Sequence, residues 1–143
     1  MGVYADTRSP VKINSGIYAQ ERHCVMTNNI VSDLVRNCFS AFLSKDRQTL
    51  ESLLSDDFTF NSPRDDHINK TIYFETCFPH SDRFREHTIE QLFVQGNEAF
   101  VRYHAELDDG TRFRNVEYFR IEENKIREID VYFGSIITKN QTI

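Results

Sequence analysis

The 143-residue sequence contains no tryptophan, only three prolines and only five glycines. So few glycines leave no loop of the kind that cradles a phosphate group, which excludes the usual nucleotide-binding motifs. Cys24, Cys38 and Cys77 are widely spaced and form no Cys-x-x-Cys pair. This spacing predicts reduced thiols rather than disulfides, and Cys38 falls in a helical apolar pattern that predicts a core position. The histidines also lack the close spacing of metal ligands, so we expect neither a metal nor a cofactor.

Long apolar runs are absent as well. No segment approaches the ~20 apolar residues that a membrane-spanning helix needs, and the N-terminus has no apolar stretch typical of a secretory signal. Acidic residues outnumber basic ones by 22 to 17, and the formal charge of −5 argues against nonspecific binding to nucleic acid. We therefore expect a cytoplasmic protein whose partners are neither membranes nor nucleic acids.

What the sequence does contain is a regular pattern over residues 96–134. Hydrophobic residues make up 39% of the chain and twelve residues are Phe, which is enough for the core of one domain. Within this stretch three segments alternate between apolar and polar side chains, separated by the turn signals Asp109-Gly110 and Glu123-Asn124. The alternation predicts three strands, whose apolar faces carry Ala99, Val101, Tyr103, Ala105 and Leu107, then Phe113, Phe119 and Ile121, then Ile129, Val131 and Phe133.

Asn115 and Glu117 interrupt the apolar row of the second of these strands. Polar residues in a core-facing row predict either a satisfied buried hydrogen bond or a lined cavity. Glu117 could pair with Arg102 or Arg114 of a neighbouring strand, or accept a tyrosine hydroxyl. These interpretations remain open at the level of sequence.

The remaining elements follow from helical periodicity and from capping residues. Asp46 and Asn69 stand where an N-cap is expected, and Gly96-Asn97 predicts a further hairpin turn. The polar segment RDDHIN, residues 64–69, predicts a loop. The predicted helices are 29–44, 47–55 and 70–78, and two more strands are predicted at 58–62 and 84–95. This order favours an α+β domain over residues 29–137, with a curved antiparallel or mixed sheet packed against three N-terminal helices.

The two ends of the chain stand apart from this domain. Residues 1–28 have no sustained periodicity and are interpreted as an N-terminal extension, and residues 138–143 as a C-terminal tail. Met26 opens a segment that resembles a natural start, so the extension is either non-native or an arm that packs on a neighbour. Both interpretations remain open.

Two segments carry a resemblance to a known superfamily: Asp46–Pro63, with the pattern DxxxLxxLLSDDFTFNSP, and Glu123–Gly134, which reads ENKIREIDVYFG. Together with the order of elements, they resemble the nuclear-transport-factor-2-like, or ketosteroid-isomerase-like, superfamily and its SnoaL-like members. The resemblance implies a sheet curled around a conical pocket closed by the helices, usually in a homodimer formed through the outer face of the sheet. It also implies a pocket wall formed by Phe58, Phe60, Ser62, Tyr73, His87, Tyr103, Asn115, Phe119 and Val131 around Glu117.

Two chemistries of the superfamily do not match this sequence. The steroid isomerases place a carboxylate base before the proline that follows their first strand, where this chain has Ser62. The limonene epoxide hydrolases use an Arg-x-Asp pair and a further Asp, and the aligned positions hold Tyr103, Ala105 and Val131. Neither mechanism is expected here.

Glu117, His87 and Tyr103 are the remaining candidates for catalysis. A carboxylate in an apolar pocket has a raised pKa and can act as a general base or acid near neutral pH, and histidine titrates there without tuning. Tyr103 or Asn115 could donate a hydrogen bond to an enolate. We therefore expect binding of a small apolar molecule, with metal-free isomerase, cyclase or lyase chemistry as one hypothesis. The alternative is a noncatalytic ligand-binding or dimerisation module.

Overall fold

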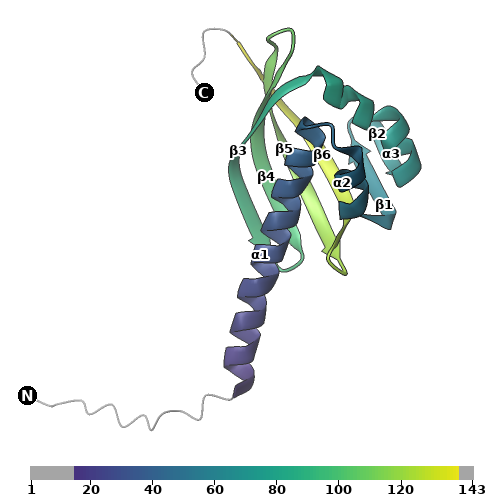
Figure 1. The fold of residues 1–143 in the computed structure, drawn as a ribbon. Helices are drawn as coiled ribbons and strands as arrows, with labels where there is room; N and C mark the ends of the chain where they lie inside the picture. Colours follow the sequence, from purple (N-terminus) through teal and green to yellow (C-terminus); the bar gives the residue numbers. More distant parts are fainter. Residues whose placement is uncertain (1–14, 139–143) are drawn as a thin grey trace, which may run out of the picture.

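The computed structural model describes the backbone of residues 15–138 and the side chains from Asn28 onward. These residues form one α+β domain, as the sequence predicts (Figure 1). The elements are α1 (Ser15–Leu43), α2 (Arg47–Leu53), β1 (Leu54–Ser62), β2 (Asp65–Asn69), α3 (Lys70–Thr76), the 3-10 helix η1 (Phe78–Arg83), β3 (Phe84–Gln95), β4 (Glu98–Leu107), β5 (Arg112–Glu122) and β6 (Lys125–Ile137).

The six strands form one mixed sheet in the order β2-β1-β6-β5-β4-β3. Strand β1 runs parallel to β6, and every other neighbouring pair is antiparallel. Figure 1 shows the sheet curved, with α1 and α2 crossing its concave face and α3 beside β1 and β2. The curvature and the helices enclose the space in which the candidate site lies.

Local sequence signals explain where the elements begin and end. Asp46 caps α2 by accepting a hydrogen bond from the backbone N–H of Thr49, and Asn69 caps α3 in the same way through Ile72. The predicted turns at 96–97, 109–110 and 123–124 all separate consecutive strands. Gly96 has a φ of +60°, in the left-handed region that such a turn requires. These caps and turns confirm the sequence predictions.

Four boundaries differ from the predictions. The third helix, predicted over 70–78, ends at Thr76 and is followed by the 3-10 helix η1, because Pro79 has no N–H to continue the α-helical hydrogen bonds. Residues 65–69, predicted as a loop, form the edge strand β2, because their backbone pairs with β1 and an edge strand needs little apolar surface. Helix α2 ends at Leu53 and β1 begins at Leu54, earlier than predicted, because Leu54 pairs with Ile126 of β6. Helix α1 begins at Ser15 rather than at residue 29. The predictions about Cys24 and about the tail fall almost entirely outside the described residues.

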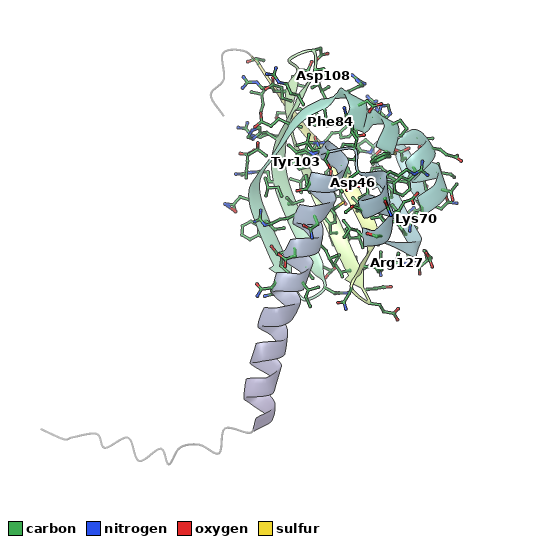
Figure 2. All side chains as sticks on the ribbon, viewed as in Figure 1. Asp46, Lys70, Phe84, Tyr103, Asp108 and Arg127 are labelled. Carbon is green, nitrogen blue, oxygen red and sulfur yellow. The ribbon has the colours of Figure 1, made fainter. Side chains whose placement is uncertain are left out.

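The core lies between the helices and the concave face of the sheet. Phe39 of α1 packs against Tyr103 of β4, with ring centroids 4.9 Å apart. Figure 2 marks Tyr103 among the side chains of the domain. Cys38 is buried beside them, which confirms its predicted core position. The apolar rows predicted for the last three strands face this core, except for Phe133, which is 54% exposed because it lies beyond the helices at the edge of the cavity. Within residues 15–138, no helix combines the length and the apolar character needed to cross a membrane.

Candidate functional site

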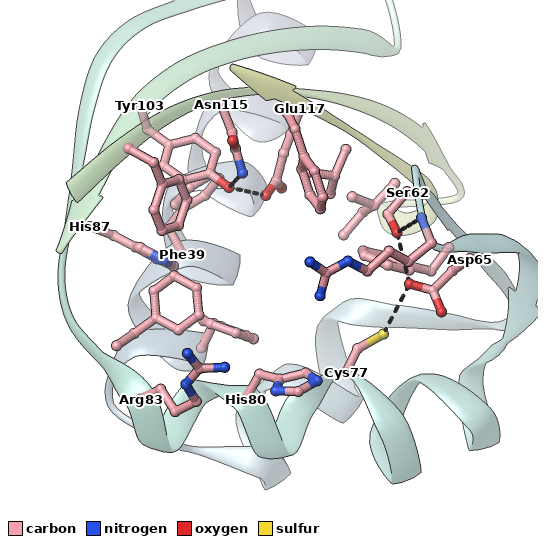
Figure 3. Close-up of a pocket in the computed structure, with 18 of the residues that line it drawn as sticks. Phe39, Ser62, Asp65, Cys77, His80, Arg83, His87, Tyr103, Asn115 and Glu117 are labelled. Atoms are coloured by element: carbon pink, nitrogen blue, oxygen red, sulfur yellow. Dashed lines mark hydrogen bonds between the residues drawn. The ribbon is translucent and has the colours of Figure 1, made fainter. Parts of the chain in front are cut away.

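A cavity of about 660 Å³ lies between the helices and the concave face of the sheet (Figure 3). This volume falls within the range of about 300–1,000 Å³ that is usual for small-molecule sites. Its wall is largely apolar, with several phenylalanine and tyrosine rings, and comes mainly from α1, β1, α3, η1 and strands β3 to β6. Of the residues predicted from sequence, it includes Phe60, Ser62, Tyr73, His87, Tyr103, Asn115, Glu117 and Val131.

Phe58 and Phe119, also predicted to line the pocket, do not reach the cavity. Both side chains are almost fully buried, with exposed fractions of 1% and 0%. Phe58 packs edge-on against Tyr73, and Phe119 contacts Phe39. Their side chains lie on the same face of the sheet as the lining residues, but they fill the core beside the cavity. Alternation along a strand determines the face on which a side chain lies and not whether it reaches the cavity.

A chain of hydrogen bonds crosses β5 and ends at Glu117. The Tyr103 hydroxyl donates to Glu117 Oε1 at 2.8 Å, and Asn115 Nδ2 donates to the Tyr103 oxygen at 3.1 Å. Because Asn115 already donates to that oxygen, the single hydroxyl proton of Tyr103 is directed at Glu117. Figure 3 shows the three side chains side by side on one wall of the cavity.

The chain is anchored at its other end by the backbone of β6. The N–H of Gly134 donates to Asn115 Oδ1 at 3.2 Å, which fixes the amide so that Nδ2 faces Tyr103. The register between β5 and β6 shifts between Phe113 and Asn115, beside Gly134. A Cβ at Gly134 would stand 2.2 Å from the carbonyl oxygen of Arg114. Only glycine fits here without displacing the backbone.

The environment of Glu117 favours its neutral form. Burial raises the pKa of Glu117 to about 7, and the hydrogen bond from Tyr103 offsets only part of that effect. Burial, together with the nearby charge of Glu117, raises the pKa of Tyr103, so the phenol keeps its proton. Arg102 and Arg114, the alternative partners, both pair with Glu90 instead. Among the described residues, the only hydrogen-bond partner of Glu117 is therefore a neutral hydroxyl.

His87 lies in an aromatic cage beside this chain. Its ring stacks on Phe42, with centroids 5.4 Å apart and planes 9° apart, and meets Phe39, Phe84 and Tyr103 edge-on. Both ring nitrogens are covered, and neither has a hydrogen-bond partner among the described residues. Burial lowers the pKa of His87 to about 4, so the ring is neutral at physiological pH. His87 shares the cavity with Glu117 and Tyr103, but its nitrogens do not contact them.

The opposite side of the cavity carries the predicted pocket residue Ser62 together with polar side chains that were not predicted to line the pocket. Ser62 Oγ donates to Asp65 Oδ2 at 2.8 Å, and the Cys77 thiol lies 3.8 Å from the same oxygen. Arg64 and Arg83 also line the cavity. Turn and 3-10 residues have no strand parity, so no sequence signal directed these arginines toward the pocket.

The cysteines of the described region are free thiols. Burial raises the pKa of Cys77 to about 11 and raises the pKa of Cys38 as well, so neither is a thiolate at neutral pH. Within that region no three His, Cys, Asp or Glu side chains are grouped so as to hold a metal ion.

Comparison with known proteins gives this fold and cavity a family. The sequence profile of the SnoaL-like domain matches residues 35–129. The chain belongs to the SnoaL-like family. This match and the fold confirm the resemblance predicted from sequence to the nuclear-transport-factor-2-like superfamily. No protein with a curated function matches the sequence.

Solved structures with the same fold come from several bacteria. A nuclear-transport-factor-2-like protein from Cytophaga hutchinsonii is 21% identical and gives a TM-score of 0.62 over 72% of this chain and 88% of its own. An epoxide hydrolase of the limonene type from Mycobacterium tuberculosis is 18% identical, with a TM-score of 0.64 over 74% and 84%. A Kribbella flavida protein provisionally assigned as a ketosteroid isomerase is 16% identical, with a TM-score of 0.65 over 82% and 87%. At these identities the likeness concerns the fold alone.

Proposed function

We propose that this SnoaL-like protein binds a small apolar molecule in the cavity and converts it by proton transfer at Glu117. The observation that carries the proposal is a buried carboxylate with a pKa of about 7, open to the cavity and held by a neutral hydroxyl. A group with this pKa exchanges protons readily at neutral pH. The aromatic wall suits a flat apolar body.

The proposed reaction begins with a carbonyl compound in the cavity. The Glu117 carboxylate removes a proton from the carbon next to the carbonyl, and the electron pair of the broken C–H bond moves to the carbonyl oxygen as an enolate. Where the compound also carries a C=C bond one carbon further on, this enolate is a dienolate. Protonated Glu117 then returns the proton to the far carbon of that double bond, the carbonyl re-forms, and the C=C bond moves next to it, which completes an isomerisation. Once Glu117 is neutral, the Tyr103 hydroxyl can turn to the enolate oxygen, while Asn115 holds the phenol in place.

We propose that His87 contributes to ligand binding after a side-chain movement. Two covered nitrogens without a partner are costly in a folded protein, and a ligand that supplies a polar group would relieve that cost. Its ring must first turn, or Phe39 and Phe42 must move, because neither nitrogen is accessible. We therefore propose His87 as a donor to the bound ligand and Glu117 as the group that moves the proton.

Epoxide hydrolysis is not proposed, although a structural neighbour carries that activity in its name. The positions aligned with the hydrolase acids and arginine hold Tyr103, Ala105 and Val131, of which only Tyr103 has a polar side chain. Ala105 is fully buried in the core. Proton transfer needs only the groups that line this cavity.

Exchange of carbon-bound hydrogen for deuterium tests the proposal without knowledge of the natural substrate. A panel of cyclic ketones is incubated with the protein in D₂O, and loss of the α-proton signal is followed by NMR. We expect wild-type protein to accelerate exchange of at least one ketone, and Glu117→Gln to lose that acceleration by about 10²–10⁴-fold. Glu128→Gln is the matched control, because Glu128 pairs with Arg120 at 2.9 Å outside the cavity.

The outcomes separate the enzyme from the alternative function. Equal exchange by wild type and Glu117→Gln would contradict the proton-transfer role. Ligands that raise the melting temperature without any exchange would support a noncatalytic binding module, since a ligand that binds only the folded state stabilises it.

We also propose that a second copy of the chain covers the outer face of the sheet. Phe93, Phe100 and Tyr132 are 68%, 51% and 56% exposed there, and Phe93 pairs directly with Phe100 across β3 and β4. Aromatic side chains exposed together are typical of an interface. We expect a mass near twice 16.9 kDa in solution and a monomer for Phe93→Asp with Phe100→Asp. Ile72→Asp, an exposed apolar position on α3, is the control that should stay dimeric. A monomeric wild type would refute this assembly.

The compartment remains a proposal as well. Cys38 and Cys77 are thiols. Free thiols suit a reducing compartment such as the cytoplasm.

A further inference from the structure

We propose that the ligand of this cavity is an apolar molecule with a carboxylate group, and that Arg64 and Arg83 bind this carboxylate at the mouth. The inference rests on the ligand pocket proposed above and adds the class of substrate. The apolar body of the ligand would lie among the phenylalanines, with its reacting end at Glu117.

Arg64 is held at the mouth by the turn between β1 and β2. Its backbone N–H donates to Ser62 Oγ at 3.0 Å, which fixes the turn. Its guanidinium lies over the ring of Phe133 of β6, 5.8 Å from the centroid, so the side chain reaches across the cavity wall. This contact holds the long side chain where it can meet a ligand.

Arg83 approaches from a different element. It is the last residue of η1, and its carbonyl accepts a hydrogen bond of 2.9 Å from the N–H of Asp108 in the turn between β4 and β5. Figure 3 shows Arg83 and His80 on the side of the cavity opposite Glu117. The cavity therefore carries two arginines and the acid Asp65 away from the wall that holds Glu117.

Neither mouth arginine forms an ion pair within 4 Å with a described side chain, although the charge of Arg83 acts on Asp109 in the neighbouring turn. Six other arginines pair with carboxylates within 4 Å, whereas Arg64 and Arg83 form no ion pair with a described residue. Arg36 and Arg112 are also without such a pair, but they do not line the cavity. Asp65, the acid on this side of the cavity, is engaged by the Ser62 hydroxyl. Two cations thus face the cavity in a chain whose formal charge is −5.

Guanidinium groups bind a carboxylate through paired charge-assisted hydrogen bonds. The carboxylate would be repelled at the other end, because a second negative charge next to buried Glu117 is unfavourable. These two effects select one orientation, with the acid group at the mouth and the apolar end against Glu117. The arginines at the mouth therefore set the orientation of the ligand, and the apolar wall provides most of its contact area.

Matched pairs of ligands test the inference. Aromatic carboxylic acids of two to four fused rings and their methyl esters are titrated into the full-length protein by calorimetry. We expect at least one acid to bind about tenfold more tightly than its ester, with the preference shrinking as salt is raised. Arg64→Gln with Arg83→Gln should abolish the preference by weakening only the acid. Arg36→Gln with Arg112→Gln, the matched control outside the cavity, should retain it.

The results distinguish this inference from the proposed function. Equal binding of acid and ester to wild type, or an unchanged preference in the Arg64→Gln, Arg83→Gln variant, overturns the carboxylate assignment and leaves the role of Glu117 intact. Glu117→Gln should retain the acid preference while it loses exchange activity. If no acid or ester of the panel binds, both the carboxylate assignment and the ligand pocket fail.

Discussion

The carboxylates on the two faces of the sheet have different partners. On the outer face, Glu128 lies 2.9 Å from Arg120, and Glu90 lies 3.2 Å from Arg114. On the inner face, Glu117 of β5 has as its only described hydrogen-bond partner the neutral hydroxyl of Tyr103, at 2.8 Å. The outer acids are thus paired with cations, whereas a buried acid beside a neutral donor retains its proton to higher pH. The difference supports the role in proton transfer that we propose for Glu117.

Among the substitutions that test this difference between the two faces, Gly134→Ala should cause the largest loss of stability. The new methyl group would meet the Arg114 carbonyl at 2.2 Å and push apart the strands that hold Asn115. We expect a loss of about 3 kcal/mol or more in the free energy of unfolding, measured by urea denaturation. Gly110→Ala is the control, because Gly110 has open space around it and only the strain of its φ of +84°. It should cost about 1 kcal/mol. Equal losses would show that the close approach at Gly134 is unimportant.

The pH dependence of stability should separate Glu117 from His87. The pKa of Glu117 is raised from 4.5 to about 7, so the folded state alone holds that proton between these values and stability falls as pH rises. The pKa of His87 is lowered from 6.5 to about 4, so the unfolded state alone holds that proton and stability rises with pH over that window. Each contributes at most about 3 kcal/mol, and the two slopes oppose each other.

Single substitutions reveal the two slopes. In urea denaturation from pH 4 to pH 8, Glu117→Gln should leave only the rise due to His87, and His87→Phe should leave only the fall due to Glu117. Parallel pH profiles for the two variants would contradict the assignment of both shifts.

Removal of the inner hydroxyl should have a smaller effect. Tyr103→Phe deprives Glu117 of its donor and leaves Asn115 Nδ2 without its acceptor, at a cost of about 2 kcal/mol. It should also raise the pKa of Glu117 and shift the pH profile of α-proton exchange in the ketone assay toward higher pH. Tyr118→Phe, which removes an exposed bond to Glu98, should cost less than about 1 kcal/mol and leave the profile unchanged. An unshifted profile in Tyr103→Phe would show that the hydroxyl does not tune the acid.

The sequence predicts most of the fold because its signals are local. Strand parity assigns Tyr103, Asn115 and Glu117 to the inner face, and capping chemistry assigns Asp46 and Asn69 to helix starts. Strand β2 was missed because it is an edge strand, which pairs through its backbone and leaves little apolar pattern to read.

The candidate site is less predictable, because it depends on contacts between distant segments. Parity could not distinguish Phe119, which fills the core, from Glu117, which opens to the cavity two residues away. The anchor from Gly134 to Asn115 depends on a register shift between β5 and β6 that the alternation does not encode. Arg64 and Arg83 reach the mouth from a turn and a 3-10 helix, where no periodicity indicates direction.

The smallest loss of stability should come from a substitution on the outer face. Glu128→Gln removes the charge that Arg120 meets, but the partly exposed Arg120 guanidinium also has Glu122 within 3.2 Å. Solvent screening and this second partner limit the loss in the free energy of unfolding to about 0.5 kcal/mol, measured by urea denaturation. If Glu128→Gln instead slowed α-proton exchange as much as Glu117→Gln, carboxylates on the two faces would be equivalent, and the special role of the buried acid would be refuted.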